Sequence, residues 1–212
     1  GLHLGHRAVL AAAREQAKAL SAPLAVMTFH PHPRRFFTPD APTPVLTTPA
    51  EKLRLLAEAG VERVYLLRFN AALASLRAEV FAEDILHRQL GARHVVTGEN
   101  FIFGAGRSGS AALLRALGER LGFGATQVPP AHGPDGDICS SSRVRALLAE
   151  GRVEEAGALL VFADGDEHGA DRRAVKAPEP VDHRHADRRD QHVEGQGDLE
   201  IDAEEERPLD AP

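Results

Sequence analysis

Apolar residues along the first 160 positions follow two different spacings. In some segments they recur every three or four residues, as on one face of a helix, and in others they form short unbroken runs bounded by proline or glycine. One helical segment also has end signals: Thr48 as a cap, Glu51 to complete a capping box, and Gly60 as a stop. The pattern predicts helices over residues 6–20, 48–60, 77–91, 110–122, 140–151 and 153–160, and strands over residues 23–29, 63–69, 93–98 and 125–130.

Strands and helices alternate along this part of the chain, an order that is typical of parallel strands joined by helical crossovers. We therefore predict an α/β fold, with a parallel sheet and helices on both of its faces. Ligands of such folds bind beyond the carboxyl ends of the strands. The segments FHPHPR, GENFIFG and SSSRVR each follow a predicted strand. No strand precedes the first helix, so we expect the first strand of the sheet to be missing.

Composition narrows the class of protein. Of the 212 residues, 43% are hydrophobic and 26% are charged, as in ordinary globular proteins. No segment has the roughly 20 apolar residues of a membrane span, and residues 1–11 do not resemble a signal peptide. The chain does not begin with methionine, which suggests a processed chain or a fragment. The single cysteine, Cys139, excludes an internal disulfide and favours a cytoplasmic protein; we expect it to be a small buried residue rather than a nucleophile.

Charge divides the chain near residue 161. The net charge is −6, but residues 163–212 hold 16 acidic and 7 basic residues, so the remaining part has a net charge of +3. This slightly basic part suits an anionic small molecule and is too weakly charged to indicate nucleic-acid binding. We predict a folded domain over residues 1–161 and a disordered charged tail over residues 162–212. Histidines in the tail are an alternative metal site that we consider less probable than a simple unstructured tail.

The segment GLHLGH places two histidines at the predicted start of the first helix. Backbone N–H groups at a helix start attract phosphate, Gly5 allows close approach, and His3 and His6 can donate hydrogen bonds from one side of the turn. Two ordinary surface histidines are an equally good interpretation of this motif alone. A zinc site is a weaker alternative, because it needs a third ligand such as His30 or His32.

A second predicted helix start, SSSRVR, has the same chemistry. Ser140, Ser141 and Ser142 offer hydroxyl and N–H groups, and the guanidinium groups of Arg143 and Arg145 can bind phosphate. A plain serine cap with solvated arginines is the alternative, and for this motif alone it is favoured. Two anion-binding helix starts in one sheet shift the interpretation toward a nucleoside triphosphate.

Two further segments offer groups for a flat heterocyclic ring. GENFIFGAGRSG supplies Asn100 as donor and acceptor and Phe101 and Phe103 for stacking or for packing under a flexible loop. FHPHPRRFF predicts a stiff, proline-directed turn with imidazoles and a basic pair. Both segments can also be plain structural loops.

Taken in order, five segments resemble motifs of the prokaryotic bifunctional riboflavin kinase/FAD synthetase family: GLHLGHRAVL, MTFHPHPRRFF, LTTPAEKLRLLAEAGVERVYLLRF, GENFIFGAGRSG and SSSRVR. The resemblance covers about residues 1–160 and concerns the FMN adenylyltransferase module of that family. It implies a Rossmann-like nucleotidyltransferase fold of the H-x-G-H class. The implied reaction is the transfer of AMP from ATP to FMN, which yields FAD and pyrophosphate.

The resemblance also implies roles for individual residues. Mg²⁺ would accompany the phosphates of ATP rather than bind a dedicated protein site. Substrates would be ATP and FMN, with no nucleic acid or membrane as partner and no indication of oligomeric state. The implied catalytic residues are His3, His6 and Arg145; the implied ATP-binding residues are Leu4, Gly5, His6, Ser140, Ser141, Ser142 and Arg145; and the implied flavin-binding residues are His32, Arg34, Asn100, Phe101, Phe103 and Arg107.

The chain departs from the family pattern at both ends. The first strand and its F-D-G turn are absent, and Val161 stands where the family continues with glycine toward a kinase domain containing P-T-A-N. We therefore expect no riboflavin phosphorylation, and the abrupt change after Leu160 resembles a shifted reading frame. Alternatives are another H-x-G-H adenylyltransferase, an inactive flavin- or nucleotide-binding remnant, and a metal-binding histidine protein.

Overall fold

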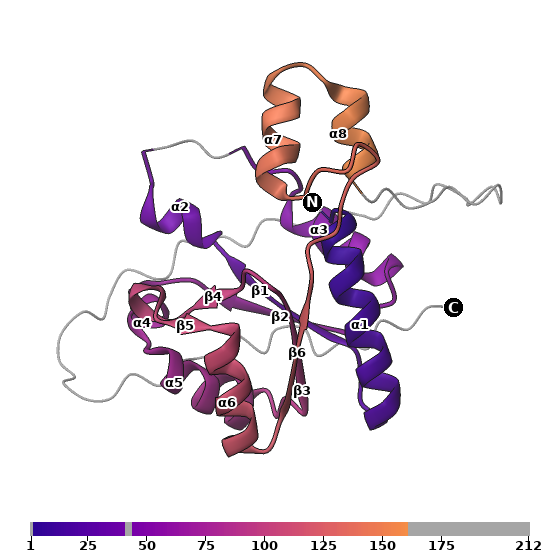
Figure 1. Cartoon of the computed structure of the whole chain (residues 1–212). Helices are drawn as coiled ribbons and strands as arrows, with labels where there is room; N and C mark the ends of the chain where they lie inside the picture. The colour runs from indigo at the N-terminus through magenta and orange to yellow at the C-terminus, as the bar shows by residue number, and fades with distance from the viewer. Residues whose placement is uncertain (1, 41–43, 161–212) are drawn as a thin grey trace, which may run out of the picture. The chain divides into compact units, whose positions relative to one another are not determined.

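Helices and strands alternate through most of the chain in a computed structural model, which describes residues 2–40 and 44–160 (Figure 1). All of these residues belong to one compact unit. The charged tail predicted for residues 162–212, its histidines and its proposed reading-frame shift lie outside the described residues.

The elements follow the predicted order, with additional short helices and strands between them. The helices are α1 (Leu4–Leu20), α2 (Pro33–Phe37), α3 (Pro49–Glu58), α4 (Ala71–Ser75), α5 (Ala78–Val80), the π-helix η1 (Phe81–Gln89), the 3₁₀ turn η2 (Ala105–Arg107), α6 (Ala111–Leu121), α7 (Ser141–Ala149) and α8 (Val153–Leu159). The strands are β1 (Ala25–His30), β2 (Arg63–Arg68), β3 (His94–Gly98), β4 (Ile102–Phe103), β5 (Gly109–Ser110) and β6 (Gly124–Val128).

Side-chain caps explain why several helices begin where they do. The hydroxyl of Thr48 accepts a hydrogen bond from the Glu51 amide at 3.1 Å, as predicted, and Pro49 occupies the first turn of α3. The predicted capping box is wrong, because the Glu51 carboxylate instead pairs with Arg54 at 2.7 Å. Gly60 follows the end of α3 with a φ of +71°, a conformation that glycine adopts without strain.

The strands form pairs rather than one sheet. β1 and β2 are parallel, with Ala25 opposite Arg63, and β3 and β6 are parallel, with His94 opposite Gly124. Parallel pairing is therefore confirmed, but a single continuous sheet is wrong. Within the described ranges no strand hydrogen bonds with both β1 and β3, so each parallel pair remains separate.

The structure also differs locally from the predictions. The short helix α4 follows β2 in a segment for which no element was predicted, and Asn70 caps it by accepting a hydrogen bond from the Leu73 amide at 2.9 Å. The predicted helix over 77–91 is mostly a π-helix, in which Leu90 donates to the Ile85 carbonyl at 2.9 Å, a five-residue step. The glycine-rich loop after β3 contains the antiparallel pair β4–β5, and the proline-directed turn contains α2.

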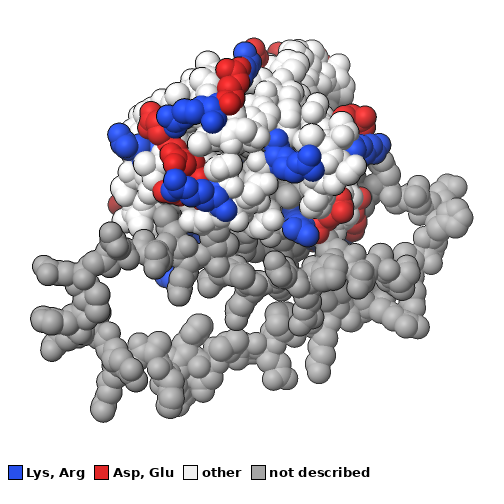
Figure 2. All heavy atoms as spheres, turned by 90° about the horizontal axis from the view of Figure 1, so that it is seen from below, with Lys and Arg blue, Asp and Glu red and all other residues white. Residues whose placement is uncertain are grey.

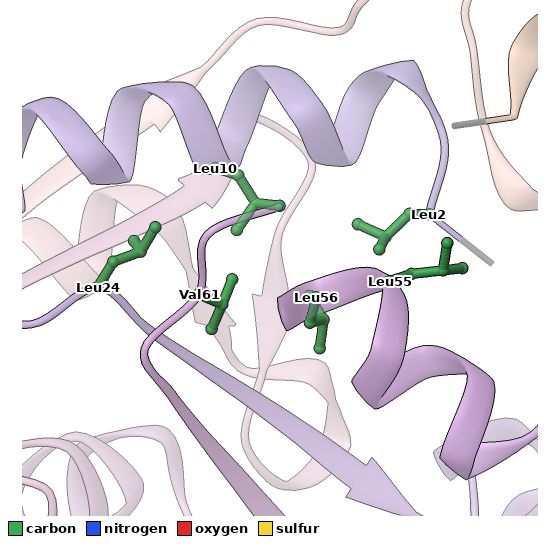
Figure 3. Packing of buried hydrophobic residues seen from close by; sticks show 6 residues of the cluster. All are labelled: Leu2, Leu10, Leu24, Leu55, Leu56 and Val61. Carbon is green, nitrogen blue, oxygen red and sulfur yellow. The ribbon is translucent and has the colours of Figure 1, made fainter. Parts of the chain in front are cut away.

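Two apolar clusters hold the N-terminal end of α1 in place. In the first, α1 packs on α3 and on the segments flanking β1 and β2, through Leu2, Leu10, Leu24, Leu55, Leu56 and Val61 (Figure 3). In the second, Leu4 packs against Cys139, Val144, Leu147, Ala156 and Leu159, which join α7 and α8. Cys139 is buried, as predicted. Burial of apolar surface stabilises a fold by about 25 cal/mol per Å², so packing on both sides fixes the start of α1.

The charged surface is mixed on the face shown in Figure 2, where basic and acidic side chains lie among uncharged ones. Among the residues that the structure describes, no helix combines the length and the apolar character that crossing a bilayer requires.

Candidate functional site

The N-terminal ends of α1 and α7 lie next to each other. A Cβ atom added at Gly5, near the start of α1, would lie 3.5 Å from the carbonyl oxygen of Cys139, the residue before the α7 cap. A bridge between His3 and Leu160 connects the same end of α1 to the end of α8, and Figure 1 shows this cluster around the beginning of the chain. The structure thus brings together the two helix starts that the sequence analysis links to phosphate binding.

His3 and His6 cap α1 reciprocally. Nδ1 of His3 accepts a hydrogen bond from the Gly5 amide at 3.1 Å, and Nδ1 of His6 accepts from the His3 amide at 3.3 Å. The helix therefore begins at Leu4, two residues earlier than predicted. Because each Nδ1 acts as an acceptor, the neutral imidazole carries its proton on Nε2. The ring centroids are 3.8 Å apart, so the two side chains act at one place.

The surroundings keep both imidazoles neutral. Burial lowers the pKa of His3, which is 8% exposed. For His6, burial is the largest cause, followed by the charges of His3, of the N-terminal amine and, last, of Lys52, and together they lower the pKa to about 4. Part of His6 is exposed, and water at that part moderates the shift. Two neutral Nε2–H donors are thus available at the start of α1.

His32 provides a third imidazole with the same arrangement. Its Nδ1 accepts from the Arg34 amide at 3.2 Å, which caps α2. The pKa of His32 is lowered by partial burial first, and then by the positive charges of Arg145, Lys52 and Arg34.

Arg145 lies half-buried on the first turns of α7. Its guanidinium donates to the Pro44 carbonyl at 2.7 Å and to the Ser141 carbonyl at 3.2 Å. Burial and the nearby charge of Arg34 lower the pKa of Arg145, although it stays far above neutrality. Arg145 is thus held against the first turn of α7, at the helix start that adjoins Gly5.

Ser140 caps α7, whereas Ser141 and Ser142 offer backbone N–H donors. The Ser140 hydroxyl accepts from the Arg143 amide at 3.2 Å, so the ordinary capping interpretation holds for Ser140. Arg143 forms ion pairs with Asp135 and Asp137, and its charge is engaged there rather than solvated. Ser141 and Ser142 occupy the first turn, where backbone N–H groups have no partner within the helix.

The hairpin after β3 is built differently from the predicted flexible loop. Phe103 is 8% exposed, and its ring centroid lies 5.8 Å from that of Phe81. The ring of Phe101 stacks on that of Phe103, with 5.4 Å between their centroids. Asn100 and Arg107 are exposed. In the part of the chain that the structure describes, no hydrogen bond or ring contact joins these four residues to the two helix starts.

Sequence reasoning missed two features. The rings of Phe36 and Phe37 pack edge-on against the ring of Phe69, with centroid distances of 5.4 and 5.7 Å. Phe37 remains 63% exposed, so an aromatic surface adjoins the His32 cap. The pair FF in the sequence was the available signal. Lys52 is the second feature, and its position on one face of a regular helix concealed it.

A protein-bound metal has little support in this geometry. Among the described residues, no group of three or more His, Cys, Asp or Glu side chains could hold a metal ion. Within those residues, His3 and His6 therefore have no third ligand of the kind that the zinc alternative requires.

Known proteins match this part of the chain. The family model for FAD synthetase matches residues 1–143. The bifunctional riboflavin kinase/FMN adenylyltransferases of Escherichia coli K12 and Pseudomonas fluorescens are each 38% identical over 160 residues, covering 76% of this chain and 51% of theirs. That of Bacillus subtilis is 35% identical over 163 residues, covering 76% of this chain and 50% of its own. The chain thus spans about half the length of these curated relatives.

A solved structure is also similar. The crystal structure of a macrolide-efflux protein from Streptococcus pneumoniae superposes with a TM-score of 0.62 at 31% identity, over 74% of this chain and 52% of the other. The match to the family model extends from the histidines of α1 to the arginine that follows the α7 serines, and so includes the two helix starts described above. The chain belongs to the FAD synthetase family.

Proposed function

We propose that this chain is an FMN adenylyltransferase, which transfers AMP from ATP to FMN and releases pyrophosphate. The observation that carries the proposal is the adjacency of the α1 and α7 starts, with Gly5 next to the Cys139 carbonyl. Two helix starts with free N–H groups and a basic surround form a site for one polyphosphate chain. Membership of the FAD synthetase family supports the choice of substrates.

In the proposed reaction an oxygen of the FMN phosphate attacks the α-phosphorus of ATP. A new P–O bond forms, the bond between the α-phosphorus and the bridging oxygen breaks, and pyrophosphate leaves with that oxygen. No covalent bond to the protein is needed, so the residues act by positioning and by stabilising negative charge.

The neutral imidazoles are the proposed catalytic donors. Nε2–H of His3 and of His6 would donate to oxygens of the triphosphate, where charge increases as the leaving group departs. Arg145 supplies a permanent positive charge from α7. The backbone N–H groups of Leu4, Ser141 and Ser142 would bind non-bridging oxygens, because they lie in the first turns of the two helices.

Mg²⁺ fits this site only as a companion of the nucleotide. The described residues offer no metal-binding cluster, so phosphate oxygens would hold the ion, as is usual for Mg²⁺. When bound, it would neutralise charge on the leaving pyrophosphate.

We place the flavin beside His32 and Arg34, with Asn100, Phe101 and Arg107 on its far side. Phe103 would support Phe101 from below, since it is buried against Phe81. We assign residues 1–161 to one Rossmann-like catalytic domain, and the single free cysteine suits a reducing cytoplasm. Riboflavin phosphorylation is outside the proposal, which concerns only the activity of the FAD synthetase family that residues 1–143 match.

The direct test is FAD formation by the purified full chain from ATP, FMN and Mg²⁺, with pyrophosphate release measured in parallel. We expect FAD and pyrophosphate in equal amounts. FMN binding without pyrophosphate release would favour an inactive remnant. Transfer of AMP to nicotinate mononucleotide or pantetheine phosphate, and not to FMN, would favour another adenylyltransferase.

A further inference from the structure

A half-buried lysine lies beside the imidazoles and was not assigned by the sequence analysis. Lys52 is on the first turns of α3, and its ammonium group donates to the Thr28 hydroxyl on β1 at 3.3 Å. Thr28 stands two residues before the carboxyl end of β1, at the edge where α/β folds bind ligands. Leu55 and Leu56, about one helical turn further along α3, belong to the same apolar cluster as Leu2, the residue before His3, so the start of α3 lies beside the start of α1. The charge of Lys52 also lowers the pKa of His6 and of His32.

The charge of Lys52 is not compensated by a neighbouring acid. In residues 2–40 and 44–160, no carboxylate lies within 4.0 Å of its ammonium group. The preceding residue, Glu51, directs both carboxylate oxygens to Arg54 at 2.7 and 3.0 Å. A half-buried ammonium group without a neighbouring carboxylate is available to bind an anion.

The hydrogen-bonding inventory leaves donors for that anion. An ammonium group has three N–H donors, and Thr28 occupies one of them. Because the Thr28 oxygen accepts from Lys52, its own proton is free to be donated. Nε2–H of His6 and of His32 are directed by their Nδ1 contacts, which are made to backbone amides. The hydrogen bonds of the described residues thus leave two N–H groups of Lys52, the Thr28 hydroxyl and the Nε2–H groups of His6 and His32 as donors.

We propose that Lys52 is a substrate-binding residue, which holds an oxygen of a phosphate group lying between His6 and His32, with Thr28 as its support. The proposal rests on the proposed function for the identity of that phosphate, which belongs to ATP or to FMN. Position alone favours the reacting phosphate, because His6 belongs to the triphosphate side and His32 to the flavin side.

The test compares Lys52→Met with Lys52→Arg and with Lys18→Met in the full chain. Lys18→Met removes the same charge from the exposed far end of α1, about 20 Å from its start at 1.5 Å per residue. Binding of pyrophosphate, MgATP and FMN is measured by calorimetry for each variant. We expect Lys52→Met to weaken binding about 10- to 100-fold for at least one of the three ligands, since it removes a hydrogen bond to a charged group. Lys52→Arg should recover part of this loss, and Lys18→Met should bind normally.

The ligand affected identifies the phosphate. If Lys52→Met binds MgATP and pyrophosphate more weakly, Lys52 contacts the triphosphate. If only FMN binding is weakened, Lys52 contacts the flavin phosphate. If the binding of both MgATP and FMN is weakened, Lys52 lies at the centre of the transfer. Unchanged binding of all three ligands in Lys52→Met overturns the proposal. If the wild-type chain binds these ligands but makes no FAD, the proposed function fails while the assignment of Lys52 stands.

A second readout does not require turnover. Removing the charge of Lys52 should raise the pKa of His6 and of His32 in an NMR titration, because that charge now lowers both. Lys18→Met should leave both values unchanged. A Lys52→Met variant that folds normally, as judged by circular dichroism, and shifts neither histidine also overturns the proposal.

Discussion

Three imidazoles in this chain use Nδ1 for the backbone and leave Nε2–H for a ligand. His3, His6 and His32 each accept a backbone N–H at 3.1 to 3.3 Å, and their pKa values are all lowered. A lowered pKa keeps the rings neutral near pH 7, so they are donors without a standing charge. A bound phosphate would raise these pKa values, because it favours the charged form.

Replacing His6 tests its role as a donor. We expect His6→Ala to reduce kcat for FAD formation about 100- to 1,000-fold, as for the loss of one transition-state donor. Stability should fall by only about 1 kcal/mol, the usual cost of a lost helix cap. His87→Ala is the matched control, since His87 is an exposed helical histidine away from the site. Equal losses of activity in both variants would contradict the assignment.

The atoms around residue 5 explain why a glycine occupies this position. An added Cβ would lie 3.0 Å from Cε1 and 3.1 Å from Nδ1 of His3, so the ring must shift. Elsewhere in a helix, Gly→Ala stabilises by up to about 1 kcal/mol. We expect Gly5→Ala to gain less than this and to weaken MgATP binding about tenfold, roughly one hydrogen bond.

The control for this prediction needs a glycine without such a contact. Gly98, at the end of β3, has no atom within 4 Å of an added Cβ. Gly98→Ala should leave MgATP binding unchanged. The reason given for Gly5 is wrong if calorimetry finds full affinity in Gly5→Ala.

At the scale of elements, α7 combines a structural and a functional start. Ser140 caps α7 and Ser110 caps α6 in the same way, each accepting an amide hydrogen bond at 3.2 Å. Replacing either serine by alanine should cost about 1 kcal/mol in urea unfolding. Only Ser140→Ala should also weaken pyrophosphate binding, because the first turn of α7 belongs to the site. Equal binding by both variants would remove α7 from the site.

Capping signals and apolar spacing were enough to predict most elements. Thr48, Ser110 and Ser140 cap helices as their positions in the sequence indicate. The π-helix was not predictable, because buried residues such as Phe81, Ile85 and Leu86 suit either an α- or a π-helical step. Segments as short as α2 and α4 contain too few residues to show a period.

The site was predictable only where the sequence motif is local. His3, Gly5 and His6 are close in sequence, and one helix turn brings them together. Lys52 was missed because its partner Thr28 is 24 residues away, a contact made by tertiary packing. The sequence pattern left open whether Phe103 stacks on a ligand or packs under the loop. Its burial in the structure shows that it packs under the loop.

For the whole molecule, the lowered histidine pKa values predict a pH dependence of stability. His3, His6, His32 and His94 bind fewer protons folded than unfolded below their ordinary pKa of 6.5. The free energy of unfolding should therefore decrease as the pH is lowered from 7.5 toward 5, through the range between the unfolded pKa and the lower folded values. Urea unfolding at several pH values measures it.

The same measurement on a variant isolates one histidine. His6→Gln removes the group whose pKa is lowered to about 4, so its stability should fall less steeply between pH 7 and 5. Saturating pyrophosphate should also flatten the decrease, because bound phosphate favours the protonated rings. A slope that is flat or reversed in the wild-type chain would contradict neutral imidazoles in the folded state.

The proposed site depends on two helix starts binding one polyphosphate, and an NMR titration of the ¹⁵N-labelled chain with pyrophosphate tests this most directly. The amide signals of Leu4 on α1 and of Ser141 and Ser142 on α7 should shift together and saturate with a single dissociation constant. Shifts confined to one helix, or two helices that saturate at different concentrations, would contradict the shared site.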